Sequence, residues 1–322
     1  MDRRTFIRRS AGVVAGASLF PLACADESAD APGAAAGAAP APSGASIRAG
    51  DPLFRISLAE WSLHRAIQDG EMTNLEFPVL TKSAYGIDAV EYVSVFMAED
   101  ATDPRYVMEL KDICDSEGVT SLLIMVDREG RLGDPDEAAR IDAVENHFRW
   151  LDVAAELGCH SIRVNAASEG TWEEQRDLAA DGLRRLTEVG ADAGLNVIVE
   201  NHGGLSSNGQ WLAEVMRTVD HPRCGTLPDF GNFRIAEGEW YDIYEGVGRL
   251  MPFAKAVSAK SHNFDADGNE REKDYERLMR IVLDAGYRGH VGIEYEGSEV
   301  SEDEGIRQTQ ALLMRVRDEL TP

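Results

Sequence analysis

Four side chains that can bind a metal ion each come directly after, or near the end of, a short apolar stretch. They are Glu200 in the run VIVEN, Asp229 in TLPDF, His262 in AKSHN and Glu294 in GIEYE. Three carboxylates and one imidazole make a mostly hard set of ligands, suited to Mn²⁺, Mg²⁺ or Co²⁺, with Zn²⁺ as an alternative. A buried carboxylate is costly unless it is paired or bound to metal, so the apolar residues before Glu200 and Glu294 favour a site over a surface position.

Two further side chains share a strand face with these candidates, because residues two apart in a strand point the same way. His202 lies two residues after Glu200, and Lys260 two residues before His262. His202 can bind the metal or a substrate hydroxyl, and we favour the hydroxyl. Lys260 can pair with a metal-bound carboxylate, contact a substrate oxygen or form an internal salt bridge.

Other polar and aromatic side chains near predicted strand ends suit a polyhydroxylated ligand. They are Glu91, Arg163, Asn232, Trp61 and His64. An aromatic face matches the apolar C–H side of a pyranose, so Trp61 and His64 can form the floor of a sugar site. Trp61 can equally belong to the core, and Asn232 can equally cap the next helix.

Alternating strands and helices follow one another from about Asp51 to the end of the chain. We expect strands at residues 54–63, 88–94, 119–126, 161–166, 195–201, 224–229, 256–261 and 291–295. We expect helices at residues 74–85, 104–117, 136–157, 173–193, 210–219, 243–251, 275–285 and 306–319. These units favour a single-domain α/β fold, a closed (β/α)₈ TIM barrel, over an open doubly wound sheet, since no G-x-G-x-x-G follows the first strand. In such a barrel the C-terminal strand ends meet at one mouth, which would bring the four candidate ligands together.

The N-terminal segment has the composition of an export signal followed by a linker. Arg3 and Arg4, a hydrophobic follower and an apolar run from Ala11 to Leu22 predict a twin-arginine signal peptide over residues 1–25. Cys24 fits a lipoprotein box, which would anchor the chain, although the same residues also fit simple secretion. Residues 26–50 are rich in Ala, Gly, Pro and Ser and predict a linker before the domain at 51–322. The expected location is therefore periplasmic, free or lipid-anchored.

The net charge bears on the kind of partner, and the cysteine content bears on disulfide bonding. The formal net charge of −25 argues against nucleic acid, whose phosphates would be repelled. The cysteines beyond Cys24 are Cys114, Cys159 and Cys224, whose number and spacing predict buried thiols and no disulfide framework. A membrane contact is expected only through an N-terminal lipid anchor, and the oligomeric state stays open.

In their order along the chain, Glu200, Asp229, His262 and Glu294 resemble the metal ligands of the xylose isomerase-like TIM barrels, the sugar phosphate isomerase/epimerase superfamily. The resemblance covers the whole domain after the linker. Similarity to ketose 3-epimerases implies that Glu200 and Glu294 also move the proton. One position departs from the pattern, because many relatives carry H-x-K-D at the seventh strand. With Lys260 aligned to that lysine, Ser258 stands at the histidine position. Three alternatives follow: His262 replaces the ligand, three protein ligands remain, or the site does not bind metal.

The resemblance implies a divalent-metal-dependent isomerase or epimerase that acts on a sugar or keto-sugar derivative through enediolate proton transfer. A small carbohydrate is then the expected partner. Two alternatives stay open: a metal-dependent dehydratase or lyase on a keto-glycoside or inosose, and a non-catalytic carbohydrate-binding lipoprotein. Replacing Glu200 and Glu294 by Gln separates an enzyme from a binder, because only an enzyme loses proton exchange.

Overall fold

The computed structural model describes residues 52–321. The predicted signal peptide at 1–25, with Cys24, and the linker at 26–50 lie outside the described residues. None of the helices within residues 52–321 combines the length and the apolar character needed to cross a bilayer.

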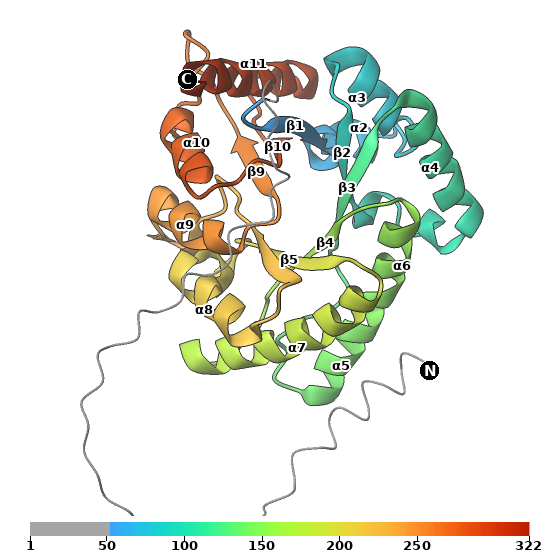
Figure 1. Ribbon diagram of the computed structural model, residues 1–322, viewed down its shortest axis with the longest axis vertical. Helices are drawn as coiled ribbons and strands as arrows, with labels where there is room; N and C mark the ends of the chain where they lie inside the picture. The colour runs from blue at the N-terminus through green and yellow to red at the C-terminus, as the bar shows by residue number, and fades with distance from the viewer. Residues whose placement is uncertain (1–51, 322) are drawn as a thin grey trace, which may run out of the picture. The chain divides into compact units, whose positions relative to one another are not determined.

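Eight parallel strands form one sheet at the centre of the domain, and the helices surround it (Figure 1). The strands are β1 (Arg55–Ala59), β2 (Ala89–Val93), β3 (Thr120–Met125), β4 (Ser161–Val164), β5 (Asn196–Glu200), β6 (Cys224–Leu227), β9 (Val257–Ser261) and β10 (His290–Tyr295). Their order in the sheet is β6-β5-β4-β3-β2-β1-β10-β9. Each strand therefore neighbours the one that precedes or follows it in the eightfold repeat, as the predicted barrel requires.

The sheet closes between its two terminal strands, β6 and β9. Lys255 N donates to Thr226 O at 2.9 Å, Ser258 N to Pro228 O at 3.0 Å, and Phe230 N to Ser258 O at 3.1 Å. These backbone bonds leave neither end strand with a free edge at this point. The TIM barrel predicted from the sequence is confirmed.

The outer layer consists of α2 (His64–Gln68), α3 (Phe77–Tyr85), α4 (Pro104–Glu117), α5 (Glu137–Asn146), α6 (Phe148–Glu156), α7 (Trp172–Asp192), α8 (Gly209–Val219), α9 (Ile243–Leu250), α10 (Tyr275–Asp284) and α11 (Glu302–Leu320). Short 3₁₀ helices follow several strands: η1 (Glu60–Leu63), η2 (Ser94–Phe96), η3 (Asp100–Thr102), η4 (Gly204–Ser207) and η5 (Met251–Phe253). Local sequence sets many of these ends. At the start of α7, Thr171 and Glu174 form a capping box, which satisfies two backbone N–H groups.

Three expectations for the elements were wrong. The first strand ends at Ala59, and η1 replaces its predicted second half. The predicted helix at 136–157 is two helices, α5 and α6, which meet at His147. A hairpin of β7 (Arg234–Ala236) and β8 (Glu239–Trp240) lies between β6 and α9 and was not predicted.

Apolar side chains fill much of the barrel interior. They are Ala59, Val93, Leu123, Met125, Ile198, Leu227 and Ala256. Beside them lies the buried carboxyl group of Glu91, and a Cβ added at Gly292 would come within 2.7 Å of its oxygens. Glycine at 292 therefore leaves room for Glu91 inside the barrel.

Candidate metal centre

Glu200, Asp229 and Glu294 meet at the barrel mouth. One ligand oxygen from each lies within 4.8 Å of the others, and all three side chains are buried. They come from the ends of β5, β6 and β10, strands that are far apart in the sequence. Among the described residues this is the one group of three or more His, Cys, Asp or Glu side chains close enough to share an ion.

Glu200 is held from two sides by neighbouring side chains. Asn232 Nδ2 donates to its Oε1 at 2.8 Å, and Arg163 Nε, from β4, lies 2.8 Å from its Oε2. The Arg163 contact has the distance of an ion pair but not the direction of a hydrogen bond, so Oε2 has no hydrogen-bond donor in the described structure. That oxygen is held by the charge of Arg163 and not by a hydrogen bond.

Asp229 is fixed by the backbone that follows it. Its Oδ1 accepts from the N–H groups of Gly231 at 2.7 Å and Asn232 at 2.8 Å. Burial raises the pKa of Asp229 to about 7; the charge of Lys260 opposes this shift, and the nearby Glu294 and Glu200 add to it. The carboxyl group therefore keeps a proton more readily than an exposed aspartate does.

Ser258 links two of the three carboxyl groups. Its Oγ lies 2.7 Å from Asp229 Oδ2 and 2.7 Å from Glu294 Oε2. A hydroxyl has one proton, so it donates to one carboxylate while the other contact needs a protonated carboxyl group. Ser258 and a proton shared with these two carboxyl groups together satisfy both contacts.

Lys260 provides the local positive charge. Its Nζ lies 3.1 Å from Glu294 Oε1, 3.4 Å from Glu296 Oε2 and 4.0 Å from Asp229 Oδ2. Burial opposes a charged amine, but the surrounding carboxylates raise the pKa of Lys260 well above its ordinary value. The same ammonium group, against the effect of burial, holds the pKa of Glu294 below its usual range. These contacts form an internal salt bridge, and they equally fit the pairing of Lys260 with a carboxylate that binds metal.

The donor set fits a hard divalent cation. Acidic groups outnumber the buried cations Lys260 and Arg163, since Glu296, Asp127 and Glu91 join the three carboxylates. Repulsion among them is part of what raises the pKa of Asp229. A divalent ion would relieve that repulsion, and Glu200 Oε2 already lacks a hydrogen-bond donor. Glu200, Asp229 and Glu294 would hold it.

His262 does not join this group. Its Nδ1 lies 3.1 Å from Lys273 Nζ, and its Nε2 lies 3.9 Å from Glu296 Oε2. His262 continues the alternation of Ser258 and Lys260 just beyond the end of β9, but its ring lies against Lys273. His262 is therefore not among the side chains close enough to share an ion, and its role as a fourth ligand stays a prediction. Ser258 occupies the space beside Asp229 and Glu294.

A cavity of about 130 Å³ opens above the carboxylates. It is lined by Trp61, Val93, Met125, Asp127, Arg163, His202, Lys260, Glu294 and Glu296. Four of the predicted contact residues, Trp61, Arg163, His202 and Lys260, thus border one space. The Trp61 ring stacks on His64 and Phe96, with centroids 4.8 Å and 5.6 Å away, and its Nε1 donates to Glu296.

Three predicted substrate contacts lie elsewhere. Glu91 lies inside the barrel, where its Oε1 accepts from Ser57 at 2.6 Å, and burial raises its pKa to about 7. His64 Nδ1 lies 2.7 Å from Trp61 O, behind the cavity wall. Asn232 uses its side chain to hold Glu200. None of the three lines the 130 Å³ cavity, but Asn232 lines a neighbouring cavity of about 660 Å³.

Two residues of the site were missed. Asp127 accepts hydrogen bonds from Arg163 at 3.0 Å and Asn165 at 2.7 Å, and Glu296 contacts Lys260. Both follow the two-residue alternation of their strands, since Asp127 comes two after the inward Met125 and Glu296 two after Glu294. That alternation was the available signal.

Comparison with known proteins supports the same reading of the fold. The sequence matches the xylose isomerase-like TIM barrel family over residues 81–316. A D-tagatose 3-epimerase-like protein superposes with a TM-score of 0.62 at 16% identity, covering 83% of this chain and 98% of that one. The zinc-bound IOLI protein gives a TM-score of 0.65 at 13% identity, covering 83% and 99%. The 3-keto-D-glucoside 4-epimerase of E. coli gives 0.58 at 17% identity, covering 82% and 100%.

A short stretch also resembles a curated enzyme subunit. The alpha subunit of the C-glycoside deglycosidase of Arthrobacter globiformis is 39% identical over 59 residues. The match spans 18% of this chain and 15% of the length of that subunit.

Proposed function

The chain belongs to the xylose isomerase-like TIM barrel family, and from this and the mouth geometry we propose that it is a metal-dependent sugar isomerase or epimerase. The observation that carries the proposal is the meeting of Glu200, Asp229 and Glu294 within 4.8 Å at the mouth. Sugar isomerases and epimerases among the similar structures agree with it, although their low identity shows the fold alone.

Under this proposal the chain's own residues bind the sugar and move a proton at the carbon next to its carbonyl group. A bound divalent cation supplies Lewis acidity that polarises that carbonyl. Glu200, oriented by Asn232 and Arg163, accepts or returns the proton on one face of the substrate. Glu294, next to Lys260, does so on the other. Return to the opposite face of the same carbon gives epimerisation, and return to the neighbouring carbon gives isomerisation.

The residues around the cavity orient the substrate. Lys260 presents an ammonium group and His202 an imidazole toward the space above the carboxylates. Both can hydrogen-bond substrate oxygens. The partly exposed Trp61 adds an aromatic wall, which suits the C–H face of a sugar ring. Asp127, held by Arg163 and Asn165, is an acceptor for a hydroxyl group.

A second candidate reaction begins with the same proton removal and ends with loss of a leaving group from the neighbouring carbon. The local similarity to a C-glycoside deglycosidase subunit, whose name describes removal of a sugar from a glycoside, supports keeping this candidate. Because both reactions share their first step, the residues assigned above serve either.

The test is deuterium uptake by the substrate carbon in D₂O, measured by NMR with free ketoses and keto-glycosides. Glu200→Gln and Glu294→Gln should each lower the uptake rate by about 10²- to 10⁴-fold, the range of general acid–base catalysis. Glu60→Gln is the matched control, since Glu60 is a buried glutamate outside the cluster, and it should keep the wild-type rate. Elemental analysis of the same samples reports the bound metal.

Two results would contradict the proposal. Unchanged uptake in Glu200→Gln and Glu294→Gln would remove both residues from the proton transfer. Sugar binding with no uptake in the metal-loaded wild-type protein would instead favour the carbohydrate-binding alternative.

A further inference from the structure

A second and larger cavity adjoins the mouth. Its volume is about 660 Å³, and it shares His202 with the 130 Å³ cavity above the carboxylates. Its walls come from the loop that contains η4, from the β7–β8 hairpin and from the segment after β9. Typical ligand pockets measure about 300–1,000 Å³, so the second cavity by itself has the size of a ligand pocket and adds room beside the smaller mouth.

The exposed face of Trp240 lines this larger cavity. The residue is 64% exposed, although it is one of the largest apolar side chains of the protein. The other exposed large apolar residues within residues 52–321 are Val79, Met108 and Met314, which are less exposed than Trp240 and lie on α3, α4 and α11. Indole in a mostly polar cavity is suited to stack on a ring that is apolar on its face and polar at its edge, as a pyranose is.

The hairpin that carries Trp240 is fixed to the carboxylate site. Tyr241 N donates to Phe233 O at 2.8 Å, and the Phe233 ring packs where α9 has only the hydrogen of Gly246. Asn201 Nδ2 donates to Asn232 O at 3.2 Å, while Asn232 holds Glu200. These contacts connect the hairpin that carries Trp240 to Asn232 and, through it, to the carboxylate of Glu200.

His262 offers a hydrogen-bond donor in the same cavity. Lys273, paired with Glu270 Oε1 at 3.0 Å, has its Nζ 3.1 Å from His262 Nδ1. An ammonium group can only donate, so Nδ1 must accept and the ring proton must be on Nε2. The nearest recorded acid oxygen, on Glu296, is 3.9 Å from Nε2 and therefore beyond hydrogen-bond distance. The Nε2–H group is left to donate to a ligand.

We propose that the 660 Å³ cavity binds the second sugar ring of a glycoside whose keto ring lies in the mouth. Trp240 stacks on that second ring, and His262 donates to one of its hydroxyl groups. The inference rests on the proposed function for the identity of the first ring, and it narrows the substrate class from free monosaccharides to keto-glycosides. His262 then contributes to substrate selection and not to metal binding.

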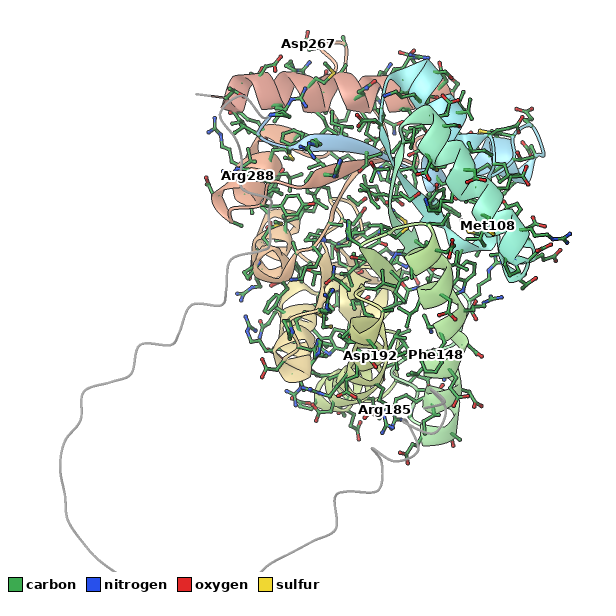
Figure 2. The ribbon with its side chains drawn as sticks, turned by 45° about the vertical axis from the view of Figure 1, so that its right-hand side comes forward. Met108, Phe148, Arg185, Asp192, Asp267 and Arg288 are labelled. Carbon is green, nitrogen blue, oxygen red and sulfur yellow. The ribbon has the colours of Figure 1, made fainter. Side chains whose placement is uncertain are left out.

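Binding and exchange are measured separately on the full chain. Calorimetry compares cellobiose, which has two rings, with methyl β-D-glucoside, which has one. Cellobiose should bind the wild-type protein about tenfold more tightly, and Trp240→Ala should remove this preference without changing the affinity for methyl β-D-glucoside. Met108→Ala is the matched control, because Met108 is 54% exposed and projects from the outer face of α4 (Figure 2); it should leave both affinities unchanged.

His262→Ala tests the second contact. It should weaken cellobiose binding several-fold and leave the metal content by elemental analysis unchanged. Loss of metal from this variant would return His262 to the ligand set and overturn its assignment as a substrate donor. Thermal melting of each variant establishes that it remains folded.

The exchange assay separates this inference from the proposed function. With cellobiose oxidised at C3 of its non-reducing ring, Trp240→Ala should lower kcat/KM for deuterium uptake about tenfold relative to the one-ring ketone. A two-ring binding preference that depends on Trp240, without any exchange, keeps the subsite and refutes the enzyme. Equal affinities for one and two rings in the wild-type protein, or equal losses for both in Trp240→Ala, refute the subsite.

Discussion

Ser258 is the residue on which the charge arrangement at the mouth depends. Its hydroxyl group lies 2.7 Å from both Asp229 and Glu294, where it moderates their repulsion. We expect Ser258→Ala to lower the free energy of unfolding of the metal-free protein by about 1–3 kcal/mol, because a buried acceptor loses its donor. Mn²⁺ should restore most of this loss, since the cation neutralises the same oxygens. Urea unfolding after EDTA treatment, with and without MnCl₂, measures both quantities.

Ser261→Ala is the control for that prediction. Ser261 is also buried on β9, but its hydroxyl bonds to Thr309 at 2.6 Å on the outer side of the barrel. Mn²⁺ should not restore the stability that this variant loses. Equal recovery in both variants would show that Ser258 has no special relation to the ion.

The burial of Glu60, a residue outside the carboxylate cluster, makes the free energy of unfolding depend on pH. Complete burial raises its pKa from 4.5 to about 8, against the opposing hydrogen bonds from Val93 N and Asn74. Between these two pH values the folded state holds a proton that the unfolded state releases. Its contribution to stability is therefore full below pH 4.5 and falls as pH rises, by at most about 1.4 kcal/mol per pH unit, until pH 8.

Glu60→Gln removes this dependence because an amide does not titrate. The difference in unfolding free energy between wild type and Glu60→Gln should decline steadily from pH 5 to pH 8, as measured by urea titration. Glu76→Gln serves as control, since Glu76 is exposed and the hydrogen bonds from Thr73 lower its pKa. A difference for Glu60→Gln that stays level across this range would mean that Glu60 is ionised in the folded protein.

Sequence alone singled out the three carboxylates of the candidate metal centre because strand-end carboxylates after apolar runs are costly without a partner. It missed Asp127 and Glu296, although both follow the alternation of their strands, because each also looks like an ordinary acidic loop residue. It also extended the alternation past Ser261 to predict His262 as a ligand, but the His262 ring lies beside Lys273, outside the group of three carboxylates. The direction of a side chain beyond a strand depends on tertiary contacts, here with Lys273.

At the scale of elements, the contact between α9 and the hairpin makes a sharp prediction. A Cβ at Gly246 would lie 2.1 Å from Phe233 Cε1, whereas one at Gly248 would meet Ile281 Cγ2 at 3.8 Å, an ordinary contact. We expect Gly246→Ala to cost about 1–3 kcal/mol through overpacking. Gly248→Ala, on the same helix, should gain up to about 1 kcal/mol from helix propensity.

Urea unfolding of the two alanine variants measures the contrast. Gly246→Ala should also reduce the two-ring preference, because displacement of Phe233 moves the hairpin that carries Trp240. Similar stability changes in both variants would show that the α9 surface accommodates a methyl group at either position.

Helices and strands could be predicted from the sequence where the apolar pattern runs over many residues and where Pro or Gly marks the ends. The helix α4 has the predicted bounds, since Pro104 starts it and Gly118 ends it in a left-handed conformation with φ of 64°. The break at His147 carries no Gly or Pro. There the ring contacts Ala143 O at 2.7 Å while His147 N bonds Val144 O, so a side chain competes with the helical pattern. The hairpin escaped notice because strands of three and two residues are too short to show alternation.

At the scale of the whole molecule, the excess of acidic residues sets the response to salt. A net charge of −25 produces repulsion that is screened at high ionic strength. We expect the melting temperature to rise between 0.1 M and 2 M KCl, as measured by calorimetry. Sucrose at matched osmolality is the control for solvent exclusion, and a falling melting temperature in KCl would show that surface ion pairs outweigh the repulsion.

The barrel joins its two end strands through a few backbone bonds between β6 and β9, and the carboxylates of the mouth stand on both sides of that seam. Asp229 follows β6, and Glu294 lies on β10, the neighbour of β9. An ion bound by both carboxylates would therefore link the two sides of the closure between β6 and β9. Metal binding and closure of the barrel are then coupled equilibria: closure raises the affinity for the ion, and the bound ion stabilises the closed barrel. If residues 1–25 direct transport of an already folded chain, as their twin arginines predict, the compartment of synthesis decides which ion the protein carries.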